Sequence, residues 1–237
     1  MRYFLVIPAA GSGRRFNAAV PKQYAALGSS TVIEHSLAPF EADADCVGIV
    51  VVVAEADTTW PDISARHTRV IETAPGGAER VHSVRAGLRA LAARARDDDW
   101  VMVHDAARPC FAARDLALLK QSLAAHEVGG LLAIPLADTL KRAANAADPP
   151  AVEATVDRAG LWRAVTPQVF RFGHLARALD AALAAGRMPT DEAQAIEWAG
   201  FRPRLVAGRP DNIKVTTADD LTLAAAILTL RAPPENT

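Results

Sequence analysis

The sequence of 237 residues is poor in cysteine and has no excess of charge of either sign. Its two cysteines, Cys46 and Cys110, are too few for a disulfide framework, and neither lies in a metal-ligand spacing. A formal net charge of −1 argues against a general nucleic-acid binder, which usually carries a basic face or tail. Any site for an anion must therefore be local.

Long hydrophobic runs are also missing. No stretch reaches the roughly 18 apolar residues that a membrane helix needs. The apolar segment 3–7 is too short for a secretory signal and leads directly to Arg14 and Arg15, so we expect a cytoplasmic protein. No G-x-S-x-G or H-E-x-x-H motif occurs, and the six histidines are scattered.

Lysine is scarce, because 22 of the 26 basic residues are arginines. Lysine offers a compact point charge and arginine a planar fork. A lysine in a chain that otherwise uses arginine therefore suggests a site that needs the compact charge. Lys22 and Lys214 both stand in short motifs that also contain small or apolar residues. We therefore treat both as candidate site residues.

Hydrophobic residues make up 51% of the chain, which is ample for one large core, and we expect a single domain over residues 1–237. Continuous apolar runs alternate with helical patterns, as in strands that helices cover on both faces. The pattern predicts an α/β fold with a mostly parallel sheet. Strands are expected at 3–8, 47–53, 69–72, 100–104 and 130–134, and helices at 31–39, 78–95, 113–126, 173–185, 191–199 and 217–230.

Segment 136–165 departs from this alternation. Two short strand-like pieces flank a polar tip that contains Pro149 and Pro150, which predicts a β-hairpin arm. Such an arm cannot bury both of its faces by itself, so we expect it to pack on a second subunit as a dimerisation arm. A floppy surface insertion is the alternative.

The segment PAAGSGRR at 8–15 follows the first predicted strand. Small residues let backbone N–H groups approach a polyphosphate, and basic side chains add charge to hold it. The segment matches neither a P-loop nor the dinucleotide fingerprint, since Phe16 stands where the third glycine would be. A glycine turn with surface arginines is the alternative interpretation.

Ligands of parallel α/β sheets bind outside the carboxyl ends of the strands. Segments 8–15 and 104–109 each follow a predicted strand, so we expect them to face one pocket. The sequence GGAERVHS at 76–83 joins another strand to a long helix. Lys214 lies in a predicted strand over 212–216 and should point into a polar site, because burying an unpaired ammonium is costly. Cations and glycine loops together suit phosphoryl or nucleotidyl transfer.

Nine segments in this order resemble the family of 2-C-methyl-D-erythritol 4-phosphate cytidylyltransferases of the non-mevalonate isoprenoid pathway. The resemblance extends from residue 3 to about residue 230. The segments are PAAGSGRR at 8–15, PKQY at 21–24, GGAERVHSV at 76–84, VHDAARP at 103–109, DTLK at 138–141, VDRAGLW at 156–162, TPQ at 166–168, TDEA at 190–193 and NIKVT at 212–216.

The resemblance implies a fold like that of nucleotide-diphospho-sugar transferases, with an arm that crosses to the partner in a homodimer. It implies that CTP and methylerythritol phosphate are joined with release of pyrophosphate, and that Mg²⁺ is required. Family members often have an acidic residue at the position of Ala78, so this chain lacks that carboxylate for a contact to the ribose or base.

The resemblance also assigns roles to individual residues. Catalysis falls to Arg15, Lys22, Arg158 and Lys214, of which Arg15 and Lys22 stabilise the transition state. The CTP site is lined by Ala9, Ala10, Gly11, Gly77, Ser83 and Ala106. The acceptor is held by Asp105, Arg108, Thr139, Arg158, Thr166 and Lys214, with Thr139 and Arg158 coming from the other subunit. Asp105 is also a candidate ligand for Mg²⁺, which the CTP phosphates would mainly hold.

Three alternatives remain open at this point. A cytidylyltransferase for another polyol phosphate, such as ribitol 5-phosphate, would share the nucleotide half of the site. A nicotinamide-dependent oxidoreductase would share the α/β pattern, although the missing third glycine argues against it. A non-catalytic nucleotide sensor would not need both Arg15 and Lys22, since it stabilises no transition state.

Overall fold

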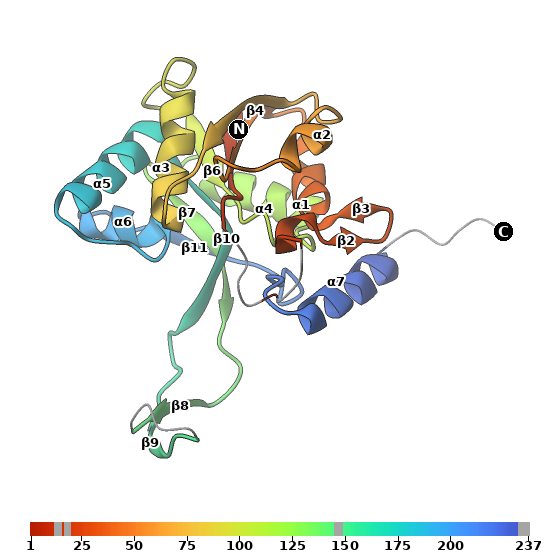
Figure 1. Cartoon of the computed structure of the whole chain (residues 1–237). Coiled ribbons are helices and arrows are strands. Elements are labelled where there is room, and N and C mark those ends of the chain that lie inside the picture. Colours follow the sequence, from red (N-terminus) through yellow and green to blue (C-terminus); the bar gives the residue numbers. More distant parts are fainter. Residues whose placement is uncertain (12–15, 17–19, 145–148, 232–237) are drawn as a thin grey trace.

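A seven-stranded sheet forms the centre of the molecule, with the strand order β11-β7-β10-β6-β1-β4-β5 (Figure 1). The computed structural model describes residues 1–11, 16, 20–144 and 149–231. Strand β10 is antiparallel to both of its neighbours, and the other pairings are parallel. The bounds are β1 Tyr3–Pro8, β4 Cys46–Val53, β5 Val70–Pro75, β6 Trp100–Val103, β7 Gly129–Pro135, β10 Trp162–Arg171 and β11 Arg204–Ala207.

Helices cover both faces of this sheet, which confirms the predicted fold class. Successive residues of β1 show why its sequence is continuously apolar: Leu5 and Ile7 enter one core, and Val6 enters the other. The first core includes α1 (Val32–Glu41), α2 (Trp60–Ser64) and α4 (Ala113–Leu123). The second includes α3 (Arg80–Leu91), α5 (Phe172–Ala184) and α6 (Glu192–Trp198).

A third, smaller apolar cluster joins α7 (Ala218–Arg231) to the body. Ala224 of α7 packs there with Cys110, Val215 and Val32. Near it lie a short hairpin of β2 (Ala26–Leu27) and β3 (Ser30–Thr31) and the 3₁₀ helix η2 (Lys22–Tyr24). Among the described residues, no helix has both the length and the apolar character that crossing a bilayer requires.

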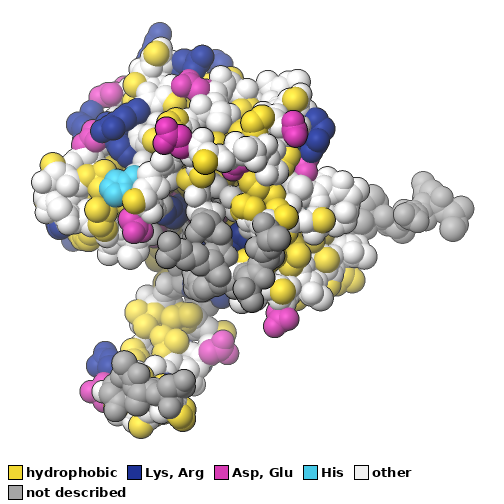
Figure 2. All heavy atoms as spheres, in the orientation of Figure 1, with side chains coloured by type: hydrophobic (Ala, Val, Ile, Leu, Met, Phe, Trp, Pro, Cys, Tyr) yellow, Lys and Arg dark blue, Asp and Glu magenta, His cyan; other side chains and the backbone are white. Residues whose placement is uncertain are grey.

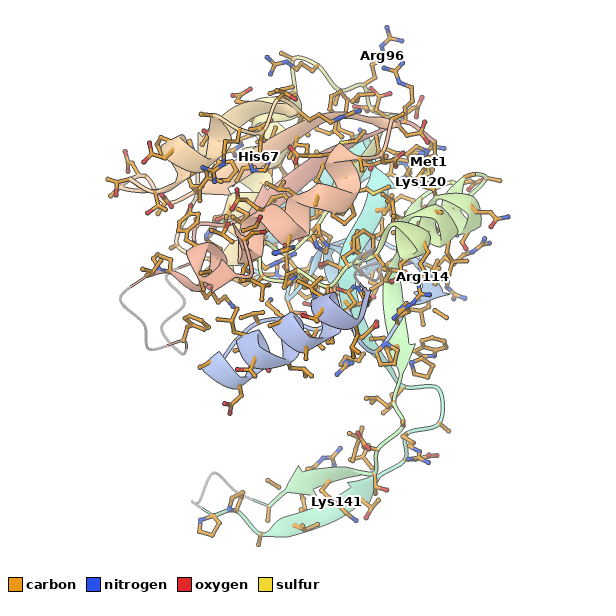
Figure 3. The ribbon with its side chains drawn as sticks, turned by 90° about the vertical axis from the view of Figure 1, so that its right-hand side faces the viewer. Met1, His67, Arg96, Arg114, Lys120 and Lys141 are labelled. Atoms are coloured by element: carbon orange, nitrogen blue, oxygen red, sulfur yellow. The ribbon has the colours of Figure 1, made fainter. Side chains whose placement is uncertain are left out.

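The arm is a separate hairpin of β8 (Leu140–Ala143) and β9 (Val152–Val156). It projects away from the body in two perpendicular views, with Lys141 on it (Figure 1; Figure 3). The predicted arm of 136–165 also contained the first residues of β10, which instead pair with β7 in the central sheet, Trp162 opposite Pro135. The arm therefore returns to the sheet earlier than expected.

Two sequence-based expectations about strands were wrong. Residues 212–216 do not form a strand; Val215 donates a single backbone hydrogen bond to Ala107, and no ladder follows. Strands β10 and β11 had not been expected. Strand β11 has only four residues, and β10 contains Thr166, Pro167 and Gln168, which interrupt its apolar pattern.

Candidate active site

A cavity of about 600 Å³ opens at the carboxyl end of β1. The loops that follow β1 and β6 both line it, so the pocket expected from the parallel topology is confirmed. Its lining residues are Pro8, Ala9, Ala10, Gly11, Lys22, Gln23, Gly77, Ala78, Glu79, Arg80, Ser83, Asp105, Ala106, Ala107 and Lys214.

One wall of the cavity is built from small residues. The side chain of Gln23 is buried and donates to the carbonyl of Ala9 at 2.8 Å, which fixes the backbone after β1. A Cβ atom at Gly76 would lie 2.3 Å from the Cβ of Ala10, so only glycine permits this approach. The hydroxyl of Ser83 accepts a hydrogen bond from the backbone N–H of Gly77. The wall therefore presents backbone rather than bulky side chains.

Lys22 lies at the edge of this wall, on η2. Its ammonium donates to the carbonyl of Val215 at 3.0 Å, which ties η2 to the segment that carries Lys214. Two lysines far apart in the sequence therefore line one cavity, and both are the compact cations that the composition singled out.

The floor of the cavity holds a cluster of charges around Asp105. One carboxylate oxygen accepts from Nε of Arg80 at 3.0 Å, and the other faces Nε of Arg108 at 3.4 Å and the ammonium of Lys214 at 2.9 Å. Burial opposes the charge of Asp105, but these three cations outweigh it and hold the pKa of the carboxyl well below its usual range. Asp105 is therefore ionised.

Behind Asp105 lies a neutral histidine. Burial lowers the pKa of His104 to about 3. Its Nε2 faces the carbonyl of Arg108 at 3.3 Å, so that nitrogen carries the proton, and Nδ1 accepts from the hydroxyl of Thr166 at 3.0 Å. The hydroxyl of Thr166 in turn accepts from the backbone N–H of Asp105 at 3.0 Å. The chain of contacts fixes the backbone from which Asp105 projects.

Known proteins resemble this chain in sequence and in structure. A family model described as 2-C-methyl-D-erythritol 4-phosphate cytidylyltransferase matches residues 3–230. A protein of that name from Pseudomonas entomophila is 53% identical over 220 residues, which cover 92% of each chain. The chain belongs to the 2-C-methyl-D-erythritol 4-phosphate cytidylyltransferase family.

Solved structures agree with this assignment. A 4-diphosphocytidyl-2C-methyl-D-erythritol synthase superposes with a TM-score of 0.84 at 39% identity, covering 96% of this chain and 98% of the other. The 2-C-methyl-D-erythritol 4-phosphate cytidylyltransferase of Francisella tularensis gives a TM-score of 0.79 at 32% identity, with 96% and 100% covered. Members of the family are nucleotidyltransferases, and the oxidoreductase and ribitol phosphate alternatives are not favoured.

The cavity gathers all six residues that the resemblance assigned to CTP and two of the six assigned to the acceptor, Asp105 and Lys214. Arg108 and Thr166 lie buried beside Asp105 rather than on the cavity lining. Lys214 lines the cavity, although it lies on an irregular loop and not on the strand expected for it. Arg15 falls outside the described residues. The residues brought together on the lining are Ala9, Ala10, Gly11, Lys22, Gly77, Ser83, Asp105, Ala106 and Lys214.

The arm residues Thr139 and Arg158 do not line this cavity in their own chain. Arg158 instead donates to the carbonyl of Ala137 at the base of the arm. The cavity of a single chain therefore does not test the roles that the resemblance assigns to these two residues.

Sequence reasoning assigned no role to three side chains that build or support the site: Gln23, Arg80 and Glu192. Arg80 was visible as a cation that follows a glycine loop, and Gln23 and Glu192 lie inside two of the matching segments. What the sequence could not supply was their pairing, because Arg80 and Glu192 are 112 positions apart.

The cluster around Asp105 does not fit a Mg²⁺ ion held by protein groups. Mg²⁺ prefers carboxylates that are free to coordinate it, together with substrate phosphates. Both oxygens of Asp105 already face cations. Within the described residues, no group of three or more His, Cys, Asp or Glu side chains could hold a metal ion. Asp105 is better explained as an anchor for ion pairs.

Proposed function

We propose that this chain transfers the cytidylyl group of CTP to 2-C-methyl-D-erythritol 4-phosphate, as a step in isoprenoid precursor synthesis. The products are 4-diphosphocytidyl-2-C-methyl-D-erythritol and pyrophosphate. The observation that carries the proposal is the meeting, in one cavity, of the small-residue wall and Lys22 with the ion cluster of Asp105 and Lys214. Family membership supplies the identity of the two substrates.

The reaction needs charge stabilisation more than proton transfer. A phosphate oxygen of the acceptor forms a bond to the α-phosphorus of CTP, and the bond from that phosphorus to the bridging oxygen of the β-phosphate breaks. The attacking phosphate is largely ionised at neutral pH, since its second pKa is about 6, so no general base is required. The buried, neutral state of His104 agrees with this chemistry.

Two cations are proposed to stabilise the transition state. Lys22 lies at the edge of the small-residue wall, where the triphosphate would bind. Arg15 is the second proposed cation, on the basis of the family resemblance. We propose that CTP contacts Ala9, Ala10, Gly11, Gly77, Ser83 and Ala106.

The acceptor is proposed to bind at the floor of the cavity. A carboxylate has about four lone-pair directions, and the three cations around Asp105 use three of them. The remaining direction on Oδ1 suits a hydroxyl group of the polyol. Lys214 pairs with Asp105 while remaining 41% exposed, so its ammonium can also approach the acceptor phosphate. Arg108 and Thr166 support Asp105 from behind.

The arm is proposed to complete this half of the site in a homodimer of single-domain chains. Val152 is 63% exposed and Trp162 at the base of the arm is 37% exposed, and apolar side chains are visible on the arm surface (Figure 2). Packing on a second copy would cover them and deliver Thr139 and Arg158 to the partner's acceptor. A requirement for Mg²⁺, brought by the CTP phosphates, and a cytoplasmic location are further parts of the proposal.

Pyrophosphate release tests the proposal directly. The enzyme is assayed with each of four nucleoside triphosphates against methylerythritol phosphate and ribitol 5-phosphate, with and without Mg²⁺. We expect release only with CTP, methylerythritol phosphate and Mg²⁺. Equal rates with ribitol 5-phosphate would contradict the assigned acceptor, and release that persists in chelator would contradict the metal requirement.

A further inference from the structure

Glu192 is a carboxylate without an assigned role, and it is only 1% exposed. It lies in the TDEA segment at 190–193, on the far side of Arg80 from the cavity floor. We propose that Glu192 is a positioning residue for the acceptor: it holds the guanidinium of Arg80 so that Arg80 keeps Asp105 in place. The acceptor part of this inference rests on the proposed function.

The contacts of Arg80 make it a bridge between two carboxylates. Its Nη1 and Nη2 atoms donate to the two oxygens of Glu192 at 2.6 and 3.1 Å, and its Nε donates to Asp105 at 3.0 Å. A bidentate pair fixes the plane of a guanidinium, so Glu192 determines the direction in which Nε points. Asp105 receives a donor of defined orientation as a result.

The two residues that flank Glu192 are held by contacts from β10. The side chain of Gln168 accepts from the backbone N–H of Ala193 at 2.8 Å and donates to Asp191 at 2.9 Å. Asp191 caps α6 by accepting from the backbone N–H of Gln194. Gln168 lies opposite Val103, two residues before Asp105. The TPQ and TDEA segments thus form one support between the sheet and Arg80.

The charges explain why a carboxylate is needed at this position. Burial raises the pKa of Glu192, but both of its oxygens accept from the guanidinium of Arg80, at 2.6 and 3.1 Å, and this contact favours the ionised pair. Burial opposes the charge of Arg80, but the carboxylates of Glu192 and Asp105 outweigh it and raise the pKa of the guanidinium. With the neutral amide of Gln at this position, the Nη groups of Arg80 would keep one acceptor, would face an NH₂ donor in place of the other, and would be drawn to phosphate in the cavity. Asp105 would then lose its partner on Oδ1, the oxygen proposed to receive the acceptor hydroxyl.

The first test is kinetic and uses Glu192→Gln, which keeps the shape of the side chain and removes its charge. Losing one charge-assisted contact to Asp105 should raise KM for methylerythritol phosphate about tenfold and leave KM for CTP within about twofold. Asp180→Asn is the control, because it removes the carboxylate partner of Arg85, another arginine of α3 that does not line the cavity. Both KM values of this control should be unchanged.

The kinetic outcomes separate positioning from general support of the fold. An unchanged KM for the acceptor, or equal rises in both KM values, would overturn the proposal. A second comparison adds Arg80→Gln and the double variant with Glu192→Gln. If Glu192 acts through Arg80, the double variant should have the acceptor KM of Arg80→Gln within about twofold. If the increases in acceptor KM of the two single variants multiplied in the double variant, the proposal would be contradicted.

A crystal structure of substrate-free Glu192→Gln tests the positioning without any activity measurement. We expect Nε of Arg80 to move away from Asp105, and a retained contact near 3.0 Å would overturn the proposal. An inactive but folded wild-type enzyme would overturn the proposed function, whereas wild-type activity with an unaltered Glu192→Gln variant would overturn only the positioning role.

Discussion

The cavity floor and the arm are both proposed to contact the acceptor, yet they differ in burial and in the contacts that hold them. Asp105 is buried and meets three cations that come from α3, the loop after β6 and the segment before α7. Arg158 is exposed, and its side chain donates to the carbonyl of Ala137 at the base of the arm. The ion cluster of the floor forms within one chain, whereas we propose that the arm acts only when it packs on a second copy.

The comparison shows that one site can combine side chains fixed within a single chain with side chains positioned by a subunit interface. Residues at the floor are held by a network of charges and by the packing of two helix layers, so they are organised before any ligand binds. The strands β8 and β9 of the arm pair with each other but contribute no residue to the two main cores, so in the proposed dimer the interface would fix the position of the arm. Substitutions at the floor should therefore act within one subunit, whereas those on the arm should act across subunits.

The largest effect is expected for Lys22→Ala. Removing a cation from the transferring phosphoryl group should reduce kcat by about 10²–10³-fold, with a much smaller change in KM for CTP. Steady-state kinetics measure both quantities. Lys120→Ala is the matched control, because Lys120 pairs with Asp43 and Asp45 and does not line the cavity. Near-normal turnover of Lys22→Ala would remove this residue from the mechanism.

The second prediction tests whether the arm acts across subunits. Arg158→Ala should by itself reduce activity by about tenfold or more, because a charge-assisted contact to the acceptor is lost. Mixing Arg158→Ala subunits with Lys22→Ala subunits should restore part of the activity, since each mixed dimer contains one site in which both residues are intact. Verified heterodimers without any rescue would argue that the arm acts within its own chain.

The third prediction concerns the small-residue wall opposite the floor. Gly76→Ala would place a Cβ atom 2.3 Å from Ala10, and relieving that clash should push the wall into the nucleotide site. We expect KM for CTP to rise about tenfold while KM for the acceptor changes little. At Gly208 the nearest atom to an added Cβ is 3.4 Å away, so Gly208→Ala should leave both constants unchanged. A change confined to the acceptor KM of Gly76→Ala would contradict the division of the cavity.

The prediction with the smallest effect on activity concerns the free energy of unfolding, through a residue that does not line the cavity. Burial and the nearby Asp211 raise the pKa of Asp115 to about 6 from 3.8, so ionising this group destabilises the folded state. The penalty develops as pH rises from 3.8 to about 6. Asp115→Asn should therefore unfold with a free energy up to about 3 kcal/mol higher than wild type at neutral pH and above, and with no difference below about pH 4. Urea unfolding at several pH values measures this, and a difference independent of pH would refute the assignment.

Much of the fold could be predicted because its elements are locally encoded. The run from Cys46 to Val53 is apolar on both faces, and the buried residues Val81, Val84, Leu88 and Leu91 of α3 recur at helical spacing. Strand β10 could not be predicted in the same way. Its polar residues find hydrogen-bond partners in distant parts of the chain, as Gln168 does at the start of α6. Its place between β6 and β7 therefore depends on tertiary packing.

The candidate site shows the same division. Lys22 and the small residues 9–11 could be chosen from the sequence because a phosphate site has a recognisable local composition. The support behind Asp105 could not, because Arg80 and Glu192 are ordinary charged residues until the fold brings them within 2.6 Å of each other. Lys214 was expected for the correct reason, the cost of an unpaired charge, but on the wrong type of element.

The sequence by itself determined the layered α/β architecture and the chemical character of the cavity, since apolar periodicity and small or basic loops act through neighbouring residues. Only the tertiary structure decided which carboxylate meets which cation at the floor, and that the arm residues lie away from the cavity of their own chain. The physical reason is the separation of the interacting residues along the chain. Backbone preferences and burial patterns depend on nearby residues, whereas an ion pair such as that of Arg80 with Glu192 exists only after distant segments have packed together.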